Sequence, residues 1–199
     1  MTSKLLLMWL AAFPLMGSPG PATISLAGIG TGFGFRNGMQ YLCGIVLGTV
    51  AVLILIATGV TALVLAIPVL VTALTTLALV YILYLAWKIA TAPVLVSKSA
   101  NNEAPSLASG FILAIANPKA FAAIGAVYSS HTLINNDLIA DNILKIASLT
   151  VVIVVVNTAW LFFGSSFSKM LSNQKQGRIA NLVFALMLLV SVAFALINF

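Results

Sequence analysis

The chain has 199 residues, of which 62% are hydrophobic and only 6% are charged. A soluble domain carries about a quarter charged residues, so this composition excludes an ordinary water-soluble fold. The net charge of +6 is spread over the ends of apolar segments, which argues against nucleic acid as a partner and for the lipid bilayer. A single cysteine, Cys43, and a single histidine exclude an internal disulfide framework and make a poor metal site. We therefore expect an all-α integral membrane protein with no cofactor and no bound metal.

Six stretches are apolar over a length that crosses a bilayer as a helix, which takes roughly 20 residues. They cover residues 5–33, 38–66, 68–91, 106–130, 143–167 and 179–198. The run that follows Lys4 also resembles a signal peptide, whose removal would leave five spans. Because apolar sequence continues well beyond that run, six spans are the preferred prediction.

Two of these stretches are interrupted near their middle. Gly17-Ser18-Pro19-Gly20-Pro21 breaks the first, and Asn117-Pro118-Lys119-Ala120 breaks the fourth. Each proline removes a backbone donor and clashes with the preceding turn, so neither sequence stays in a regular helix. In lipid, such a break survives only where protein buries it or where it lines a wet cavity. Two broken helices in corresponding places indicate the binding site of a transporter.

The broken stretches begin two halves of three spans each, 1–91 and 106–199, joined by an inner loop at about 92–105. An odd number of spans inverts the second half relative to the first, so the broken helices run in opposite directions. We predict a single transmembrane transporter domain over residues 1–199, with six helices arranged as two inverted three-helix repeats and both breaks near the midplane.

The basic residues predict that both termini lie outside. With that orientation, Lys4 and Lys145 lie on the outer side beside Asp137 and Asp141. Loops on the cytoplasmic side of a membrane protein carry an excess of lysine and arginine. The inner side then holds Arg36, Lys88, Lys98, Lys169, Lys175 and Arg178.

Each helix that restarts after a break exposes unpaired N–H groups and the positive end of its dipole, which suits a carboxylate. The alternative is a pair of proline kinks that only shape packing. The predicted donors are the N–H groups of Ala22, Thr23, Ile24, Lys119, Ala120 and Phe121.

Lys119 lies in the middle of a span, where a lysine costs about 2.5–3.5 kcal/mol on insertion scales. We expect it to face a wet cavity, a carbonyl cluster or an anionic substrate; the alternative is snorkelling to the interface. Asn117 would supply an amide beside it or cap the restarted helix. Asn157, in the fifth span, would line the path or bond to a neighbouring helix. Gly44-x-x-x-Gly48 would serve an internal helix contact or a homodimer.

Taken together, these motifs resemble the LysE/RhtB family of amino-acid exporters, in order and over nearly the whole chain. Pro19-Gly20-Pro21 is similar to the PGP signature of that family. The other similar features are the glycine spacing of Gly38, Gly44 and Gly48, the third-span ending Tyr81 to Lys88, Gly110-Phe111, and Asn117-Pro118-Lys119-Ala120.

The resemblance implies secondary export of amino acids or similar small metabolites across a bacterial cytoplasmic membrane, driven by the proton gradient. It implies that the site consists of Pro19, Gly20, Pro21, Asn117, Pro118 and Lys119. The reasoning on the helix restarts and on the fifth span adds Thr23 and Asn157 to the predicted site.

Thr49 departs from the family pattern, because many relatives carry an aspartate at that position. No span then contains an acid, which weakens the case for proton antiport and for a cationic amino acid as cargo. Three other functions stay open: a non-transporting accessory protein, a metal-ion exporter and an intramembrane enzyme. The enzyme is least favoured because nothing links Ser18 to His131, the only histidine, so we assign no catalytic residue.

Overall fold

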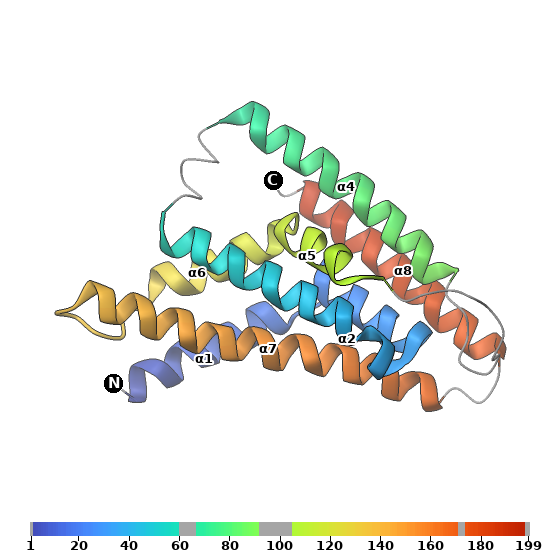
Figure 1. Ribbon diagram of the computed structural model, residues 1–199, viewed down its shortest axis with the longest axis horizontal. Coiled ribbons are helices and arrows are strands. Elements are labelled where there is room, and N and C mark those ends of the chain that lie inside the picture. Colours follow the sequence, from blue (N-terminus) through green and yellow to red (C-terminus); the bar gives the residue numbers. More distant parts are fainter. Residues whose placement is uncertain (1, 60–66, 92–104, 171–173, 198–199) are drawn as a thin grey trace.

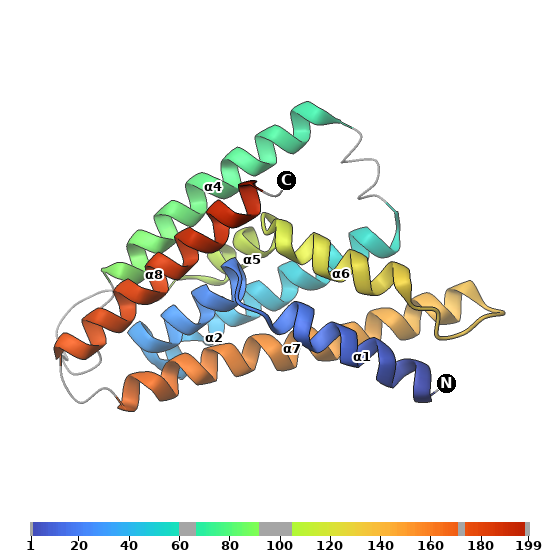
Figure 2. The same ribbon diagram turned by 180° about the vertical axis from the view of Figure 1, so that it is seen from behind.

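The computed structural model describes residues 2–59, 67–91, 105–170 and 174–197, and all regular structure in these ranges is helical (Figure 1). The helices form an elongated bundle in which α4 and α8 lie side by side along one flank (Figures 1 and 2). In chain order they are α1 (Thr2–Gly17), α2 (Pro21–Ala57), α4 (Pro68–Ala90), α5 (Leu107–Ile115), α6 (Pro118–Ser130), α7 (Leu138–Met170) and α8 (Gln174–Ile197).

α2 folds back on itself at Gly34. This glycine has φ 80° and ψ 168°, a left-handed conformation that side chains other than glycine rarely adopt. The Tyr41 hydroxyl donates to Ser25 Oγ at 3.0 Å. In a straight helix, residues with this spacing would lie about 24 Å apart. α2 is therefore a helical hairpin with arms 21–33 and 35–57, close to the predicted boundary between the first two spans.

By length and composition, two described helices could cross a membrane: the segment Leu138–Phe167 and α2, in which the arm 35–57 is long enough by itself after the turn at Gly34. α5 and α6 are inclined by 61° at their break and together could form a third span. α7 exposes Val154 and Phe162, as expected of a helix that faces lipid. These features agree with the predicted helical membrane protein. The six-span count, the inverted repeat and the single domain over 1–199 stay predictions, and the inner loop 92–105 lies almost entirely outside the described residues.

Glycines allow α2 to pack backbone to backbone against its neighbours. A Cβ on Gly44 would overlap the Leu107 carbonyl of α5, and one on Gly110 would overlap the Tyr41 carbonyl. On the other arm, a Cβ on Gly164 of α7 would overlap the backbone of Ala27. Of the two alternatives for the Gly44-x-x-x-Gly48 motif, the structure shows the internal helix contact.

Two apolar clusters form the core. One joins α2, α4, α5, α7 and α8, and includes Ile29 and Leu85. The other joins α1, the end of α2, α6 and α7, and includes Met8 and Val152. Both helix breaks lie in the middle of the bundle (Figure 1).

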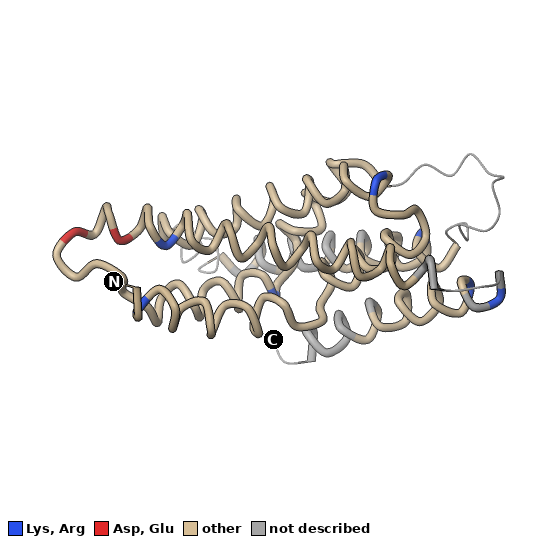
Figure 3. Tube along the Cα trace, turned by 90° about the horizontal axis from the view of Figure 1, so that it is seen from below, with Lys and Arg blue, Asp and Glu red and all other residues tan. Residues whose placement is uncertain are grey.

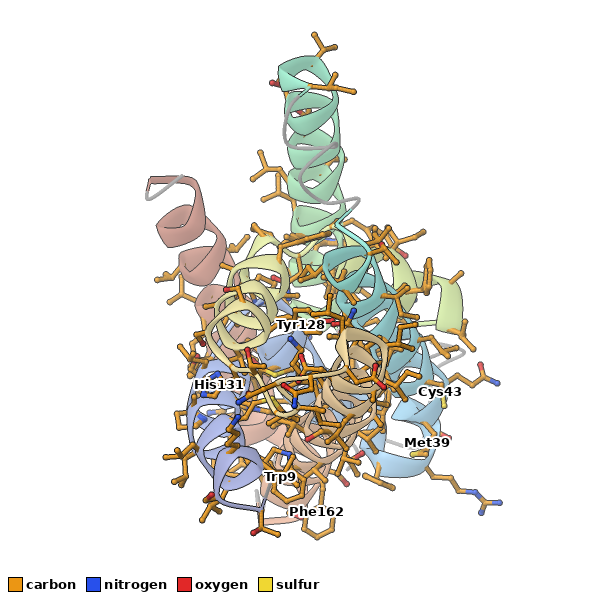
Figure 4. All side chains as sticks on the ribbon, turned by 90° about the vertical axis from the view of Figure 1, so that its left-hand side faces the viewer. Trp9, Met39, Cys43, Tyr128, His131 and Phe162 are labelled. Atoms are coloured by element: carbon orange, nitrogen blue, oxygen red, sulfur yellow. The ribbon has the colours of Figure 1, made fainter. Side chains whose placement is uncertain are left out.

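Apart from Lys119, the charged residues of the described helices gather toward the ends of the bundle, with the acidic ones at one end (Figure 3). At that end Lys4 Nζ donates to Asn135 Oδ1 at 2.7 Å, and Lys145 pairs with Asp141 at 3.0 Å. Figure 4 looks onto this end and shows Tyr128, whose ring lies 4.1 Å from Lys145 Nζ. The residues predicted to share the outer side thus share one end of the bundle, while the side of the membrane that this end faces stays a prediction.

Candidate functional site

The two helix breaks meet in the middle of the bundle. α1 enters the middle from the acidic end and stops at Gly17, whereas α6 starts there at Pro118 and runs back to the same end (Figures 1 and 2). Lys119 Nζ donates to the Ser18 carbonyl, and to the Pro19 carbonyl at 3.3 Å. The structure therefore places Lys119 at a carbonyl cluster, one of the three environments predicted for it.

Gly20 is the residue that lets Lys119 reach this position. A Cβ on Gly20 would overlap Lys119 Cδ and lie 3.0 Å from Lys119 Nζ. Its φ of −170° is extended backbone that any residue adopts, so the requirement for glycine is one of space. The glycine of the first break thus makes room for the lysine of the second.

Two of the six predicted donors at the helix restarts take part in ordinary first-turn bonds. The N–H of Ile24 donates to the Gly20 carbonyl at 2.9 Å, and the N–H of Ala120 donates to the Asn117 carbonyl at 3.0 Å. The prediction of free N–H groups is therefore wrong for Ile24 and Ala120, because each helix closes its first turn immediately after its proline. Thr23 has a different role, since its Oγ1 accepts the Gly20 N–H at 2.9 Å.

Asn117 directly precedes α6 and is 4% exposed. It occupies the capping position, yet its side chain makes no capping bond, so the predicted cap is wrong. Its Oδ1 is buried and accepts no hydrogen bond from the described residues. A buried acceptor without a donor costs free energy, which marks this amide as a group available to a ligand.

A pocket opens at this junction, with about 420 Å³ of space when its open mouth is included. Of the predicted site residues, five contribute to its wall, while Pro19, Pro21 and Pro118 shape the adjoining breaks. The wall is formed by Met16, Gly20, Ala22, Thr23, Thr49, Asn117, Lys119, Ala120, Ala123, Ile124, Ile153, Val156 and Asn157.

Thr49 is the polar wall residue that the predicted site did not include. It is 7% exposed, and its Oγ1 donates to the Ile45 carbonyl at 2.7 Å. The sequence did hold a signal for this residue, namely its departure from the family pattern. An aspartate at this position, as in many relatives, would place a carboxylate in this wall. Ile153 was also missed; it lies one turn before Asn157 on the same face of α7.

α7 contributes a polar group to the pocket and a support to the end of α1. Asn157 lies in the wall, and its Nδ2 donates to the Ile153 carbonyl of its own helix at 2.7 Å. Of the two roles predicted for Asn157, the structure thus supports lining over a bond to a neighbouring helix. Trp160 Nε1 donates to the Gly17 carbonyl at 3.0 Å and so holds the last turn of α1.

The chemistry of the wall is that of a polar binding site. Among the described residues, Lys119 is the only charged one in this wall, and the other polar side chains are the amides of Asn117 and Asn157 and the hydroxyls of Thr23 and Thr49. Across the described ranges, no group of three or more His, Cys, Asp and Glu side chains could hold a metal ion.

The Ser18 and His131 pair weighed for an enzyme is not brought together. Ser18 Oγ donates to the Leu15 carbonyl beside the first break. His131 lies at the acidic end of the bundle, where its Nδ1 is 2.9 Å from the Val127 carbonyl (Figure 4). The structure therefore offers this serine no histidine as a base.

Comparison with known proteins agrees with the motif resemblance. The model of the LysE type translocator family matches residues 13–198, a stretch that holds both breaks and every residue of the pocket wall. No curated protein and no solved structure matches the chain.

Proposed function

This chain belongs to the LysE type translocator family, and from that membership we propose that it is a secondary-active exporter of amino acids or similar small carboxylate metabolites. We place it in a bacterial cytoplasmic membrane, with both termini outside. Transport proceeds by alternating access, in which the two halves of the chain rock about the central pocket. The proton gradient supplies the driving force.

The observation that carries this proposal is the position of Lys119. Its ammonium lies in the wall of the pocket at the junction of the two breaks, within reach of a bound carboxylate. The positive ends of α2 and α6 begin at the same place and add favourable dipoles for an anion. The carboxylate of the substrate therefore binds at Lys119, between the two restarted helices.

The wall also restricts the class of cargo. Because no acidic side chain belongs to it, a second positive charge on the substrate would have no carboxylate partner. Neutral, zwitterionic amino acids fit this wall better than basic ones. For the same reason, a carboxylate of this pocket does not carry the coupled proton.

The test is efflux from dipeptide-loaded cells that lack their own exporters. Expression of this chain should accelerate efflux of one or a few amino acids. Lys119→Ala and Asn117→Ala should each abolish that efflux while the protein still inserts into the membrane. Lys4→Ala is the matched control, since Lys4 lies at the acidic end and bonds Asn135.

Each outcome of this assay bears on one part of the proposal. Normal efflux from both site variants would rule out the assigned site. No efflux of any amino acid by the wild-type chain, with the protein present in the membrane, would rule out amino acids as cargo.

A further inference from the structure

Two carbonyl oxygens at the first break accept hydrogen bonds from the Lys119 side chain. Among the described residues, Lys119 Nζ is the sole donor to the Pro19 carbonyl. The Ser18 carbonyl receives Lys119 and, at 3.3 Å, the Thr23 hydroxyl, which also lies 3.1 Å from the Gly20 carbonyl. If Lys119 turned toward a bound carboxylate, the Pro19 carbonyl would lose its donor among the described residues, and the Ser18 carbonyl would keep only the Thr23 hydroxyl at 3.3 Å.

The neighbouring carbonyls have fixed donors. The Ser18 N–H bonds the Pro14 carbonyl at 3.0 Å, and Trp160 bonds the Gly17 carbonyl. These bonds hold the end of α1 in place whatever Lys119 does. The C-terminal end of a helix carries partial negative charge, which favours a cation at this point.

A third oxygen belongs to a residue of the same pocket wall. Asn117 Oδ1 is buried, has no partner among the described residues, and lies on a residue of the pocket wall that also holds Lys119. It is an acceptor, and so calls for an N–H or O–H group of a ligand.

We propose that the carbonyl oxygens of Ser18 and Pro19, together with Asn117 Oδ1, form a binding site for a primary ammonium group. Lys119 fills two of these positions in the structure, and the ammonium of a substrate exchanges with it. The Lys119 ammonium then pairs with the carboxylate of the same substrate. Naming an amino acid as the ligand rests on the proposed function; the ammonium site itself does not.

This exchange keeps the charge of the pocket balanced. A zwitterion adds no net charge, and one ammonium remains on the carbonyl oxygens before and after binding. The site thus needs no acidic side chain, which matches the composition of the wall. It also selects for ligands with N–H donors, so a quaternary ammonium compound is excluded.

The experiment replaces the Lys119 side chain with a free amine. Lys119→Ala removes three methylenes and an ammonium, which n-propylammonium restores. We expect n-propylammonium chloride to raise the apparent Tm of the purified full-length variant saturably, by about 2–4 °C. Tetramethylammonium chloride at equal ionic strength should have no such effect, because it has no N–H.

Controls separate the site from a general effect of amines. The wild-type chain, in which Lys119 already holds the oxygens, and Lys4→Ala should show no saturable rise in Tm. Adding Asn117→Leu to Lys119→Ala should weaken n-propylammonium binding at least about fivefold, as expected for a lost hydrogen bond to a charged group. Lys119→Ser provides the same comparison if Lys119→Ala does not fold.

The effects of n-propylammonium and tetramethylammonium on the apparent Tm should therefore differ only in variants that lack the Lys119 side chain. Equal effects of n-propylammonium and tetramethylammonium on the Lys119 variants would overturn the ammonium site. If Lys119 is required for efflux and n-propylammonium does not bind, the proposed ammonium site is wrong and the proposed export function is kept. If n-propylammonium binds saturably and the wild-type chain exports no amino acid, the proposed export of amino acids is wrong and the proposed ammonium site is kept.

Discussion

Lys119 and Lys145 show two ways of accommodating a lysine in a helical bundle that has few acids. Lys145 pairs with Asp141 and also donates to the carbonyls of Tyr128 and His131, at 3.4 and 3.3 Å. Lys119 has no acidic partner in the part of the chain that the structure describes, and it relies on carbonyls that a helix break sets free. A lysine held by carbonyls is neutralised only in part, so it is the one suited to exchange its partners with a ligand.

At this scale we predict that Gly20→Ala reduces efflux about tenfold or more. The added methyl group overlaps Lys119 Cδ and displaces the ammonium from the Ser18 and Pro19 carbonyls. The hydrogen bonds of a charged group that are lost in this way are worth about 1.5–3 kcal/mol, and 1.4 kcal/mol corresponds to about a factor of ten. Efflux rates at equal expression provide the measurement. Gly125→Ala, where a Cβ meets nothing within 4 Å, is the control and should transport normally.

Thr49 leads to a second prediction about a single residue. Thr49→Asp would place a carboxylate in the same pocket wall as Lys119 and so supply a partner for a second positive charge. We expect the preferred cargo to shift toward basic amino acids, measured as the ratio of lysine to neutral amino-acid efflux. Thr49→Asn has nearly the same shape without the charge and should leave that ratio unchanged. An equal ratio in both variants would contradict the role of charge in this wall.

At the scale of elements, the hairpin of α2 is the scaffold that positions the site. Its first arm begins at the first break, and its second arm contributes Thr49 to the pocket wall. Glycines on both arms bring the backbones of α5 and α7 into contact with α2. The second break, which follows α5, and Asn157 of α7 are therefore held close to the α2 hairpin. The geometry of the pocket thus depends on close backbone packing outside the pocket wall, which a bond from the Thr31 hydroxyl to the Gly164 carbonyl at 3.1 Å supports.

We therefore predict that Gly44→Ala and Gly164→Ala destabilise the protein. The added Cβ would overlap the backbone of Leu107 in the first case and of Ala27 in the second, and neither backbone can move aside cheaply. At about 1–3 kcal/mol or more for overpacking, the apparent Tm should fall by about 3–10 °C. Thermal unfolding in detergent measures the fall. Gly125→Ala should stay within about 1 °C of the wild type.

At the scale of the whole molecule, the two ends of the bundle differ in charge and in the elements they gather. The acidic end brings the start of α1 to the segment between α6 and α7, through Lys4 and Asn135. The turn of α2 lies at the opposite end, where the Phe35 N–H donates to Ser165 Oγ at 3.2 Å. If both termini lie outside, the acidic end faces out and the α2 turn faces the cytoplasm.

Cysteine labelling tests this orientation in intact cells. Cys43 is exposed (Figure 4), so it is first replaced by serine. A membrane-impermeant thiol reagent should then label Asn135→Cys directly, and Arg36→Cys only after the membrane is permeabilised. The reverse pattern would show that the acidic end faces the cytoplasm.

Local chemistry was enough to predict several features of this protein. The apolar content required a membrane, and the missing N–H groups of Pro19, Pro21 and Pro118 required helix breaks wherever the chain folds. The sequence motifs also identified the family that the comparison with known proteins confirms.

Partners far apart in the chain were decided only by the tertiary structure. Lys119 had three predicted environments, and packing of α6 against α1 selected the carbonyls of Ser18 and Pro19. Asn117 satisfied the local pattern of a cap, yet its oxygen is left without a donor in the described residues. The physical reason is that sequence alone determines which backbone groups lose their helical partners, whereas the group that replaces a lost partner depends on which helices pack closely enough to reach it.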